Sequence, residues 1–225
     1  MIVLFGPPGC GKGTQANLIC KELNLINLSV GSSVRKFVHD NQISDSPDFD
    51  RAEKIKAMLN SGELLDFEDV KYIIEGDIKQ YISEHRNILI EGLPRTKEQA
   101  DWLANFFESN GVEVLFFHFV LDEDRVLERL SHRYYVPGNE VPYASYEKAL
   151  AACPEGVTPT QRKDDMQEDI IRHRYDVQYA SCKEGIISTM STPKDIKVIE
   201  IDASPAPDFI FGELSEIIHN HSKTF

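Results

Sequence analysis

The decapeptide GPPGCGKGTQ (residues 6–15) carries the clearest chemistry in this sequence. It nearly matches the phosphate-binding pattern G-x-x-x-x-G-K-[ST], in which glycines let backbone N–H groups face phosphate oxygens and the lysine adds a positive charge. The match fails at one place, because Gly13 stands where a Ser or Thr would offer its hydroxyl to magnesium and Thr14 follows one residue late. An apolar run precedes the decapeptide and a helical pattern begins at about Lys12. A turn between a strand and a helix is where such a motif binds phosphate, so we expect a nucleotide-binding turn here.

Five short apolar runs are predicted to form the strands around this turn. They cover residues 1–5, 25–29, 87–91, 112–120 and 196–202. Most are almost continuously apolar, as in parallel strands that helices cover on both faces. The segments between them repeat apolar residues at helical spacing. The sequence therefore predicts an α/β fold with a parallel five-stranded sheet flanked by helices.

The composition narrows the possible partners. The chain has 225 residues and a formal net charge of -13, which disfavours binding to a polyanion such as nucleic acid. No apolar run approaches the roughly 20 residues that span a bilayer. The four cysteines, Cys10, Cys20, Cys153 and Cys182, lack the spacing of a metal site or a disulfide scaffold. We therefore expect a cytoplasmic protein without zinc and without nucleic-acid or membrane partners.

Two long segments interrupt the alternation of strands and helices. Residues 30–66 separate the second and third predicted strands, and residues 134–161 are rich in Pro, Gly and Tyr. Loops of this length inside a compact domain are commonly lids or binding lobes. We interpret both segments in this way, rather than as surface insertions.

Five motifs, in order along the chain, resemble those of adenylate kinases and their nucleoside monophosphate kinase relatives. In that family a glycine also follows the lysine of the phosphate loop, and Thr14 matches the threonine after it. LSVGSSVR (28–35) resembles the family's acceptor segment, and ILIEGLPRTKEQA (88–100) resembles its D-G-F-P-R-T-x-x-Q-A motif. ERLSHR (128–133) and QRKDD (161–165) resemble the entry and the exit of its lid.

The resemblance implies a P-loop NTPase-type core with two inserted parts. We expect a core of residues 1–29, 67–132 and 163–225, a lobe for the nucleoside monophosphate at 30–66 and a lid at 133–162. The implied reaction is ATP + AMP = 2 ADP, a reversible, Mg²⁺-dependent phosphoryl transfer by a monomer. Such a transfer has a loose transition state with charge on the peripheral oxygens, so it needs positioned cations rather than a nucleophilic side chain.

The resemblance also implies roles for individual residues. The catalytic residues are expected to be Lys12, Arg95, Arg129, Arg162 and Arg174. ATP is expected to contact Gly9, Cys10, Gly11, Lys12, Gly13, Thr14, Arg129 and Arg133. AMP is expected to contact Val30, Gly31, Arg35, Leu65, Gly92, Arg95, Gln99, Arg162 and Arg174. Arg172 is the alternative to Arg174, because matching the family's last arginine requires one inserted residue.

Three positions depart from the family pattern. Val30, Ser32 and Glu91 stand where the family has Thr, Asp and Asp. The two family carboxylates hold the water shell of Mg²⁺, so we expect Glu91 to contact the metal through water and Ser32 to contribute little. Two other functions stay open: a kinase for another acceptor or donor base, and a nucleotide-binding regulatory protein with little turnover.

Overall fold

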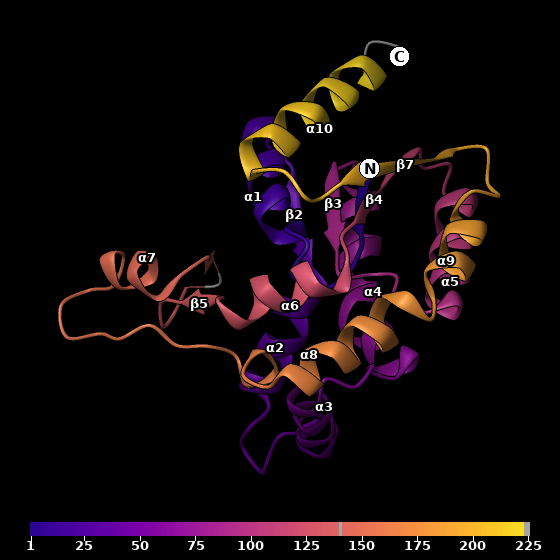
Figure 1. The fold of residues 1–225 in the computed structure, drawn as a ribbon. Coiled ribbons are helices and arrows are strands. Elements are labelled where there is room, and N and C mark those ends of the chain that lie inside the picture. Colours follow the sequence, from indigo (N-terminus) through magenta and orange to yellow (C-terminus); the bar gives the residue numbers. More distant parts are fainter. Residues whose placement is uncertain (140, 223–225) are drawn as a thin grey trace.

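The computed structural model describes residues 1–139 and 141–222 (Figure 1). The strands are β1 (Ile2–Phe5), β2 (Ile26–Ser29), β3 (Ile88–Glu91), β4 (Val114–Val120), β5 (Tyr134–Tyr135), β6 (Pro142–Tyr143) and β7 (Ile196–Asp202). The helices are α1 (Lys12–Leu23), α2 (Val30–Asp40), α3 (Phe49–Ser61), α4 (Phe67–Ser83), α5 (Lys97–Ser109), α6 (Glu123–Ser131), α7 (Tyr146–Ala151), α8 (Glu168–Tyr175), α9 (Lys183–Met190) and α10 (Pro207–Ser222). A 3-10 turn at Lys163–Asp165 precedes α8, and a π-helical turn at Asp176–Ala180 follows it.

Five of the strands form one parallel sheet in the order β2-β3-β1-β4-β7. The predicted five-stranded parallel sheet is therefore confirmed, and each predicted strand agrees with an observed one to within about two residues at either end. The carboxyl ends of parallel strands lie at one edge, where open α/β sheets bind their ligands. The turns that follow β1, β2 and β3 consequently meet at that edge.

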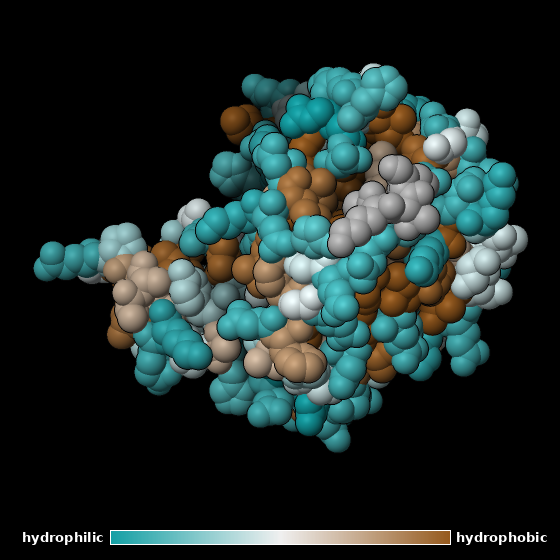
Figure 2. Space-filling model, turned by 90° about the horizontal axis from the view of Figure 1, so that it is seen from above, coloured by the Kyte–Doolittle hydropathy of each residue, from teal (hydrophilic) through white to brown (hydrophobic). Residues whose placement is uncertain are grey.

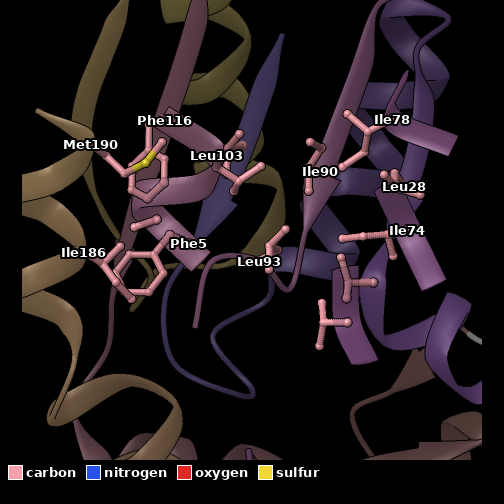
Figure 3. Close-up of a cluster of buried hydrophobic side chains, with 14 of the residues drawn as sticks. Phe5, Leu28, Ile74, Ile78, Ile90, Leu93, Leu103, Phe116, Ile186 and Met190 are labelled. Atoms are coloured by element: carbon pink, nitrogen blue, oxygen red, sulfur yellow. The ribbon is translucent and has the colours of Figure 1, made fainter. Parts of the chain in front are cut away.

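Successive residues of a strand point to opposite faces of the sheet, and here each face enters its own core. In β1, Val3 and Phe5 belong to one buried cluster, whereas Ile2 and Leu4 belong to the other. The first cluster includes side chains of α2, α4, α5 and α9, and Figure 3 shows part of it around the sheet. The second includes side chains of α1, α6 and α10. Because helices cover both faces, β1, β3 and β4 are almost continuously apolar rather than alternating.

The segment that carries β5, β6 and α7 projects from the rest of the molecule (Figure 1). β5 and β6 form an antiparallel pair, and Tyr135 also exchanges backbone hydrogen bonds of 2.8 and 2.9 Å with Thr160. Figure 2 shows this projection from above, with hydrophobic side chains on its surface. Val141, Tyr146 and Leu150 are its most exposed large hydrophobic residues. Among the helices within the described residues, none is both long enough and apolar enough to cross a membrane.

Candidate active site

A cleft of about 910 Å³ opens at the carboxyl ends of β1, β2 and β3. Its walls come from the turns after these strands, from α8 and from the projecting segment. All the residues predicted from the sequence to bind nucleotide or metal line it: Gly9, Cys10, Gly11, Lys12, Gly13, Thr14, Val30, Gly31, Arg35, Leu65, Glu91, Gly92, Arg95, Gln99, Arg129, Arg133, Arg162 and Arg174. The structure thus brings together, in one cavity, residues from five separate motifs.

The turn after β1 wraps around the ammonium group of Lys12. Lys12 Nζ donates hydrogen bonds to the carbonyl oxygens of Gly6 and Pro7, at 2.8 and 2.7 Å. The turn depends on left-handed backbone at Gly11, where φ is 101°. At Gly9 a Cβ would lie 2.9 Å from the side chain of Leu130, so this position has no room for a side chain. Burial lowers the pKa of Lys12 from its ordinary value. The turn therefore holds a desolvated cation at the N-terminus of α1, the arrangement that binds phosphate.

Glu91 is fixed at the floor of the cleft, where β3 ends. Ser29, its partner in the parallel register of β2 and β3, donates a hydrogen bond of 2.6 Å from Oγ to Glu91 Oε1. Both carboxylate oxygens lie near α1, since a Cβ built on Gly13 would lie 3.4 Å from Glu91 Oε2 and 3.7 Å from Glu91 Oε1. The carboxylate of Glu91 thus lies beside the first turn of α1.

Arg95 is held by backbone and side-chain contacts on two sides. Its Nε donates to the carbonyl oxygen of Gly92 at 3.0 Å, and its Nη1 donates to Gln178 Oε1. Its backbone N–H donates to Gln99 Oε1 at 2.7 Å, while Thr96 Oγ1 caps α5 by accepting from Gln99 N at 3.1 Å. Burial, followed by the neighbouring charge of Arg174, lowers the pKa of Arg95 to about 10. A guanidinium among other cations favours an anionic ligand, because such a ligand relieves their repulsion.

Two arginines of the projecting segment flank one aromatic ring. Tyr135 is buried, and the guanidinium carbons of Arg162 and Arg133 lie 4.3 and 5.6 Å from the centre of its ring. Burial, followed by the charge of Arg35, lowers the pKa of Arg162. The charges of Arg35 and Arg162 therefore act on one another although their motifs are far apart in the sequence.

Asp165 joins this segment to α8. Its buried carboxylate accepts hydrogen bonds of 2.6 to 2.8 Å from Arg133 and one of 2.8 Å from Arg174. Arg174 also donates to the carbonyl oxygen of Asp164 at 2.9 Å. Burial alone would lower the pKa of Arg133, but the charge of Asp165 counteracts it and the pKa is raised. The last residues of QRKDD thus orient two cations that line the cleft.

Arg172 and Arg174, the two candidates for the last arginine, have different environments. Arg174 is buried and lines the cleft. Arg172 has a side chain that is 40% exposed, and it pairs with Glu123 and Glu168 outside the cleft wall. The geometry favours Arg174.

The chain was compared with known protein families and with curated proteins. A family model described as adenylate kinase matches residues 4–194. The chain belongs to the adenylate kinase family. It is therefore a phosphotransferase, and adenylate kinases convert ATP and AMP into two molecules of ADP.

Relatives named adenylate kinase match the chain over nearly its full length. One from Methanococcoides burtonii is 32% identical over 230 residues, covering 98% of this chain and 99% of its own. One from Petrotoga mobilis is 27% identical over 226 residues, covering 99% of each chain. One from Salinibacter ruber is 27% identical over 221 residues, covering 96% of this chain and 97% of its own. Membership of the adenylate kinase family thus extends along the whole chain, at modest identity.

Three residues that the sequence did not single out contact predicted residues through their side chains. They are Ser29, Tyr135 and Gln178, and all three line the cleft. Tyr135 follows Arg133 by two residues, the spacing of side chains on one face of a strand. Gln178 follows Arg174 by four residues, the spacing of side chains on one face of a helix. Those spacings were the available signals, although neither shows which partner the side chain contacts.

Proposed function

We propose that this adenylate kinase binds AMP between Arg35, Arg95 and Gln99, with Arg162 and Arg174 beside the phosphoryl group in transit. The observation that carries the proposal is the concentration of guanidinium groups in one cleft, where burial and then the charges of Arg174 and Arg35 lower the pKa of Arg95 to about 10. Arginine binds phosphate through two parallel N–H groups and stays charged when it is buried. Holding two anionic substrates in line is worth about 7 to 11 kcal/mol of the barrier.

The donor triphosphate occupies the other end of the cleft in this proposal. The backbone N–H groups of the turn after β1 and the ammonium of Lys12 bind its phosphates. Arg129 lies beside the same turn, and its Nη2 donates to the carbonyl oxygens of Ala203 and Ser204 at 2.9 and 3.2 Å. Arg133, which Asp165 orients, lies over the transferring group.

Mg²⁺, which adenylate kinases use with ATP, fits beside Glu91 in this cleft. Within the described residues, no cluster of three or more His, Cys, Asp or Glu side chains is arranged to hold a metal ion by itself. Mg²⁺ commonly keeps several waters and takes its remaining ligands from substrate phosphates and one or two carboxylates. Glu91 and the hydroxyl of Thr14 supply oxygen atoms there, and we propose that Glu91 acts through water. The bound ion supplies charge neutralisation on the phosphates.

The same proposal divides the chain by role. We assign residues 1–29, 67–132 and 163–225 to the core, residues 30–66 to the lobe for AMP and residues 133–162 to the lid. Residue 140 and residues 223–225 of these ranges lie outside the described part of the structure. Closure of the lobe and the lid excludes water from the two substrates, and a bisubstrate analogue should compact the protein in solution scattering. We further propose a cytoplasmic monomer without zinc.

The test is an ADP-forming assay with MgATP and a panel of AMP, GMP, UMP and CMP, repeated with other donor triphosphates. We expect AMP to give the highest kcat/KM, with a weaker affinity than the family norm because Val30 replaces a threonine. A higher kcat/KM for UMP or CMP would assign another acceptor. Binding of ATP without transfer to any monophosphate would favour the regulatory function, which the absence of an acidic side chain at Ser32 suggests.

A further inference from the structure

Gln178 uses both ends of its side-chain amide inside the cleft. It lies in the π-helical turn after α8 and is 7% exposed. Its Oε1 accepts a hydrogen bond from Arg95 Nη1, and its Nε2 donates one of 3.1 Å to the carbonyl oxygen of Gly62. Single π-helical turns inside helices occur frequently at functional sites. The amide therefore bridges Arg95 and the end of α3.

Gly62 is packed in a way that fixes its carbonyl group. It ends α3 with left-handed backbone, φ 77°. A Cβ built on it would lie 2.7 Å from Arg174 Cγ and 3.1 Å from Ile170 Cγ2, so the backbone lies directly against α8. A shift of the segment 30–66 that moves Gly62 consequently moves the oxygen to which Gln178 donates.

The side-chain amide of Gln178 also helps to orient the guanidinium plane of Arg95. Gly92 O holds Nε at 3.0 Å and Gln178 Oε1 holds Nη1, so contacts at two of its three nitrogens fix the fork. Glutamine is suited to this place because one amide carries both an acceptor and a donor. A hydrocarbon side chain of similar length would leave Gly62 O and one Arg95 N–H without these contacts.

We propose that Gln178 is a positioning residue: it couples the position of the segment 30–66 to the orientation of the Arg95 side chain. This inference rests on the proposed role of Arg95 as a ligand of the acceptor phosphate. When the segment adjoins α8, the Gln178 bridge holds Arg95 in the orientation that receives the phosphate. Loss of the bridge weakens acceptor binding specifically. The donor end of the cleft keeps its affinity, because the side-chain hydrogen bonds of Gln178 within the described residues go to Arg95 and Gly62.

The test compares Gln178→Met and Gln178→Glu with the wild-type protein. Methionine removes both hydrogen bonds at similar length. Glutamate keeps an acceptor for Arg95, but as a carboxylate it cannot donate to Gly62 O and it offsets the charge of Arg95. We expect KM for AMP to rise about tenfold to a hundredfold in Gln178→Met, the range for losing a hydrogen bond to a charged group, while KM for ATP changes less than about twofold. Gln178→Glu should also bind AMP more weakly. Gln80→Met, on the exposed face of α4, is the matched control and should leave both constants unchanged.

Hydrogen exchange tests whether Gln178 holds the end of α3, and calorimetry tests the binding of AMP directly. Hydrogen exchange of peptides covering residues 59–65 should become faster in Gln178→Met and stay unchanged in Gln80→Met. A wild-type KM for AMP in either folded Gln178 variant would overturn the proposal, as would equal losses for ATP and AMP together with a lower Tm. Titration calorimetry with AMP separates this inference from the proposed function. If the wild-type protein binds AMP without turnover, the proposed function is refuted, and the AMP affinities of the Gln178 variants decide the positioning role. If it binds ATP but no AMP, both the proposed function and the positioning role are refuted.

Discussion

The hydroxyl of Ser29 donates a hydrogen bond of 2.6 Å to Glu91 Oε1 and so joins the carboxyl ends of two neighbouring strands. A short bond from a hydroxyl to a carboxylate is among the stronger hydrogen bonds in proteins. It fixes one oxygen of Glu91 and holds the carboxylate beside the first turn of α1, where the phosphate-binding turn ends. The carboxylate is therefore held in one orientation beside the proposed metal position.

Glu91→Gln should lower activity strongly and raise the Mg²⁺ concentration needed for half-maximal rate. Residues that orient metal-bound groups typically contribute about 10- to 100-fold in metal affinity or activity, and we expect that loss here. Ser29→Ala should cause a smaller loss in the same direction, because Glu91 remains but is less well oriented. Ser32→Ala is the control and should change the Mg²⁺ dependence slightly. Titration of the rate with Mg²⁺ checks this, and an unchanged dependence in Glu91→Gln would refute the role of Glu91.

Lys12→Ala should reduce kcat by on the order of a thousandfold, because it removes a preorganised charge from the phosphates. The fold should survive, since the hydrogen bonds of the Lys12 side chain in the described structure go to carbonyl oxygens of its own turn and to the Cys10 thiol. Lys21→Ala, on the exposed side of the same helix, should retain wild-type turnover. Steady-state kinetics together with circular dichroism decide the matter: near-normal turnover in folded Lys12→Ala would rule out the assignment of the phosphate turn.

The sequence was sufficient to predict the sheet and many of the residues that line the cleft. The strands were predictable because helices cover both faces, which makes runs such as residues 114–120 apolar except for His118. Cleft residues such as Lys12 and Gln99 were predictable because GPPGCGKGTQ and GLPRTKEQA resemble motifs of a known family and carry their local turn and helix geometry in their own sequence. The Thr96 cap that places Gln99 in the first turn of α5 is an example.

The contacts between distant segments were not predictable in the same way. Gln178 and Gly62 are 116 residues apart, and Ser29 and Glu91 are 62 apart. A single sequence shows that each of these four residues is polar or small. It does not show which backbone carbonyl or carboxylate the fold brings within hydrogen-bonding distance of Gln178 or Ser29. The choice between Arg172 and Arg174 was open for the same reason, because burial against α3 and the 3-10 turn depends on tertiary packing.

Asp165→Asn should lower the free energy of unfolding by about 3 to 5 kcal/mol, the cost of leaving buried charge uncompensated. The side chain of Asp165 is 0% exposed and accepts hydrogen bonds from both Arg133 and Arg174. Asp169→Asn, in the exposed first turn of α8, should cost far less. Urea unfolding of the three proteins at pH 7 measures the differences, and equal losses in both variants would contradict the prediction.

Stability should fall as the pH drops below about 6.5, in part through His118. Burial lowers the pKa of His118, with the charge of Glu200 opposing that shift and the charge of Lys183 adding to it. The unfolded chain therefore takes up a proton at a higher pH than the folded one, so acid favours unfolding between the two pKa values. His118 Nε2 lies 2.9 Å from the hydroxyl of Tyr179, and His118→Gln keeps a polar group near it.

We expect the wild-type free energy of unfolding to decrease more steeply than that of His118→Gln between pH 7.5 and pH 5. Over the window in which only the unfolded chain is protonated, the difference approaches about 1.4 kcal/mol per pH unit. Urea unfolding at several pH values measures it, with His219→Gln on the exposed side of α10 as control. Parallel curves for wild type and His118→Gln would show that His118 does not contribute.

The wild-type protein should prefer AMP to GMP because of the way Gln99 is held. Gln99 is 2% exposed and lines the cleft, and its Oε1 accepts from the backbone N–H of Arg95. Its amide NH₂ is then the donor that a purine in the cleft meets. Adenine offers an acceptor at N1, whereas guanine carries a hydrogen there. Guanine would leave this buried donor unpaired, which costs about 1 to 3 kcal/mol, so kcat/KM for AMP should exceed that for GMP by roughly 10- to 100-fold.

Gln99→Glu should shift this preference toward GMP. The carboxylate still accepts from the Arg95 N–H, but it cannot donate to adenine N1, while it can accept from the N–H groups of guanine. We therefore expect kcat/KM to fall for AMP and to fall less, or to rise, for GMP. Gln42→Glu, in the exposed turn after α2, adds the same charge away from the cleft and should leave the ratio unchanged. An AMP-to-GMP ratio in Gln99→Glu equal to that of the wild type would mean that Gln99 does not read the acceptor base.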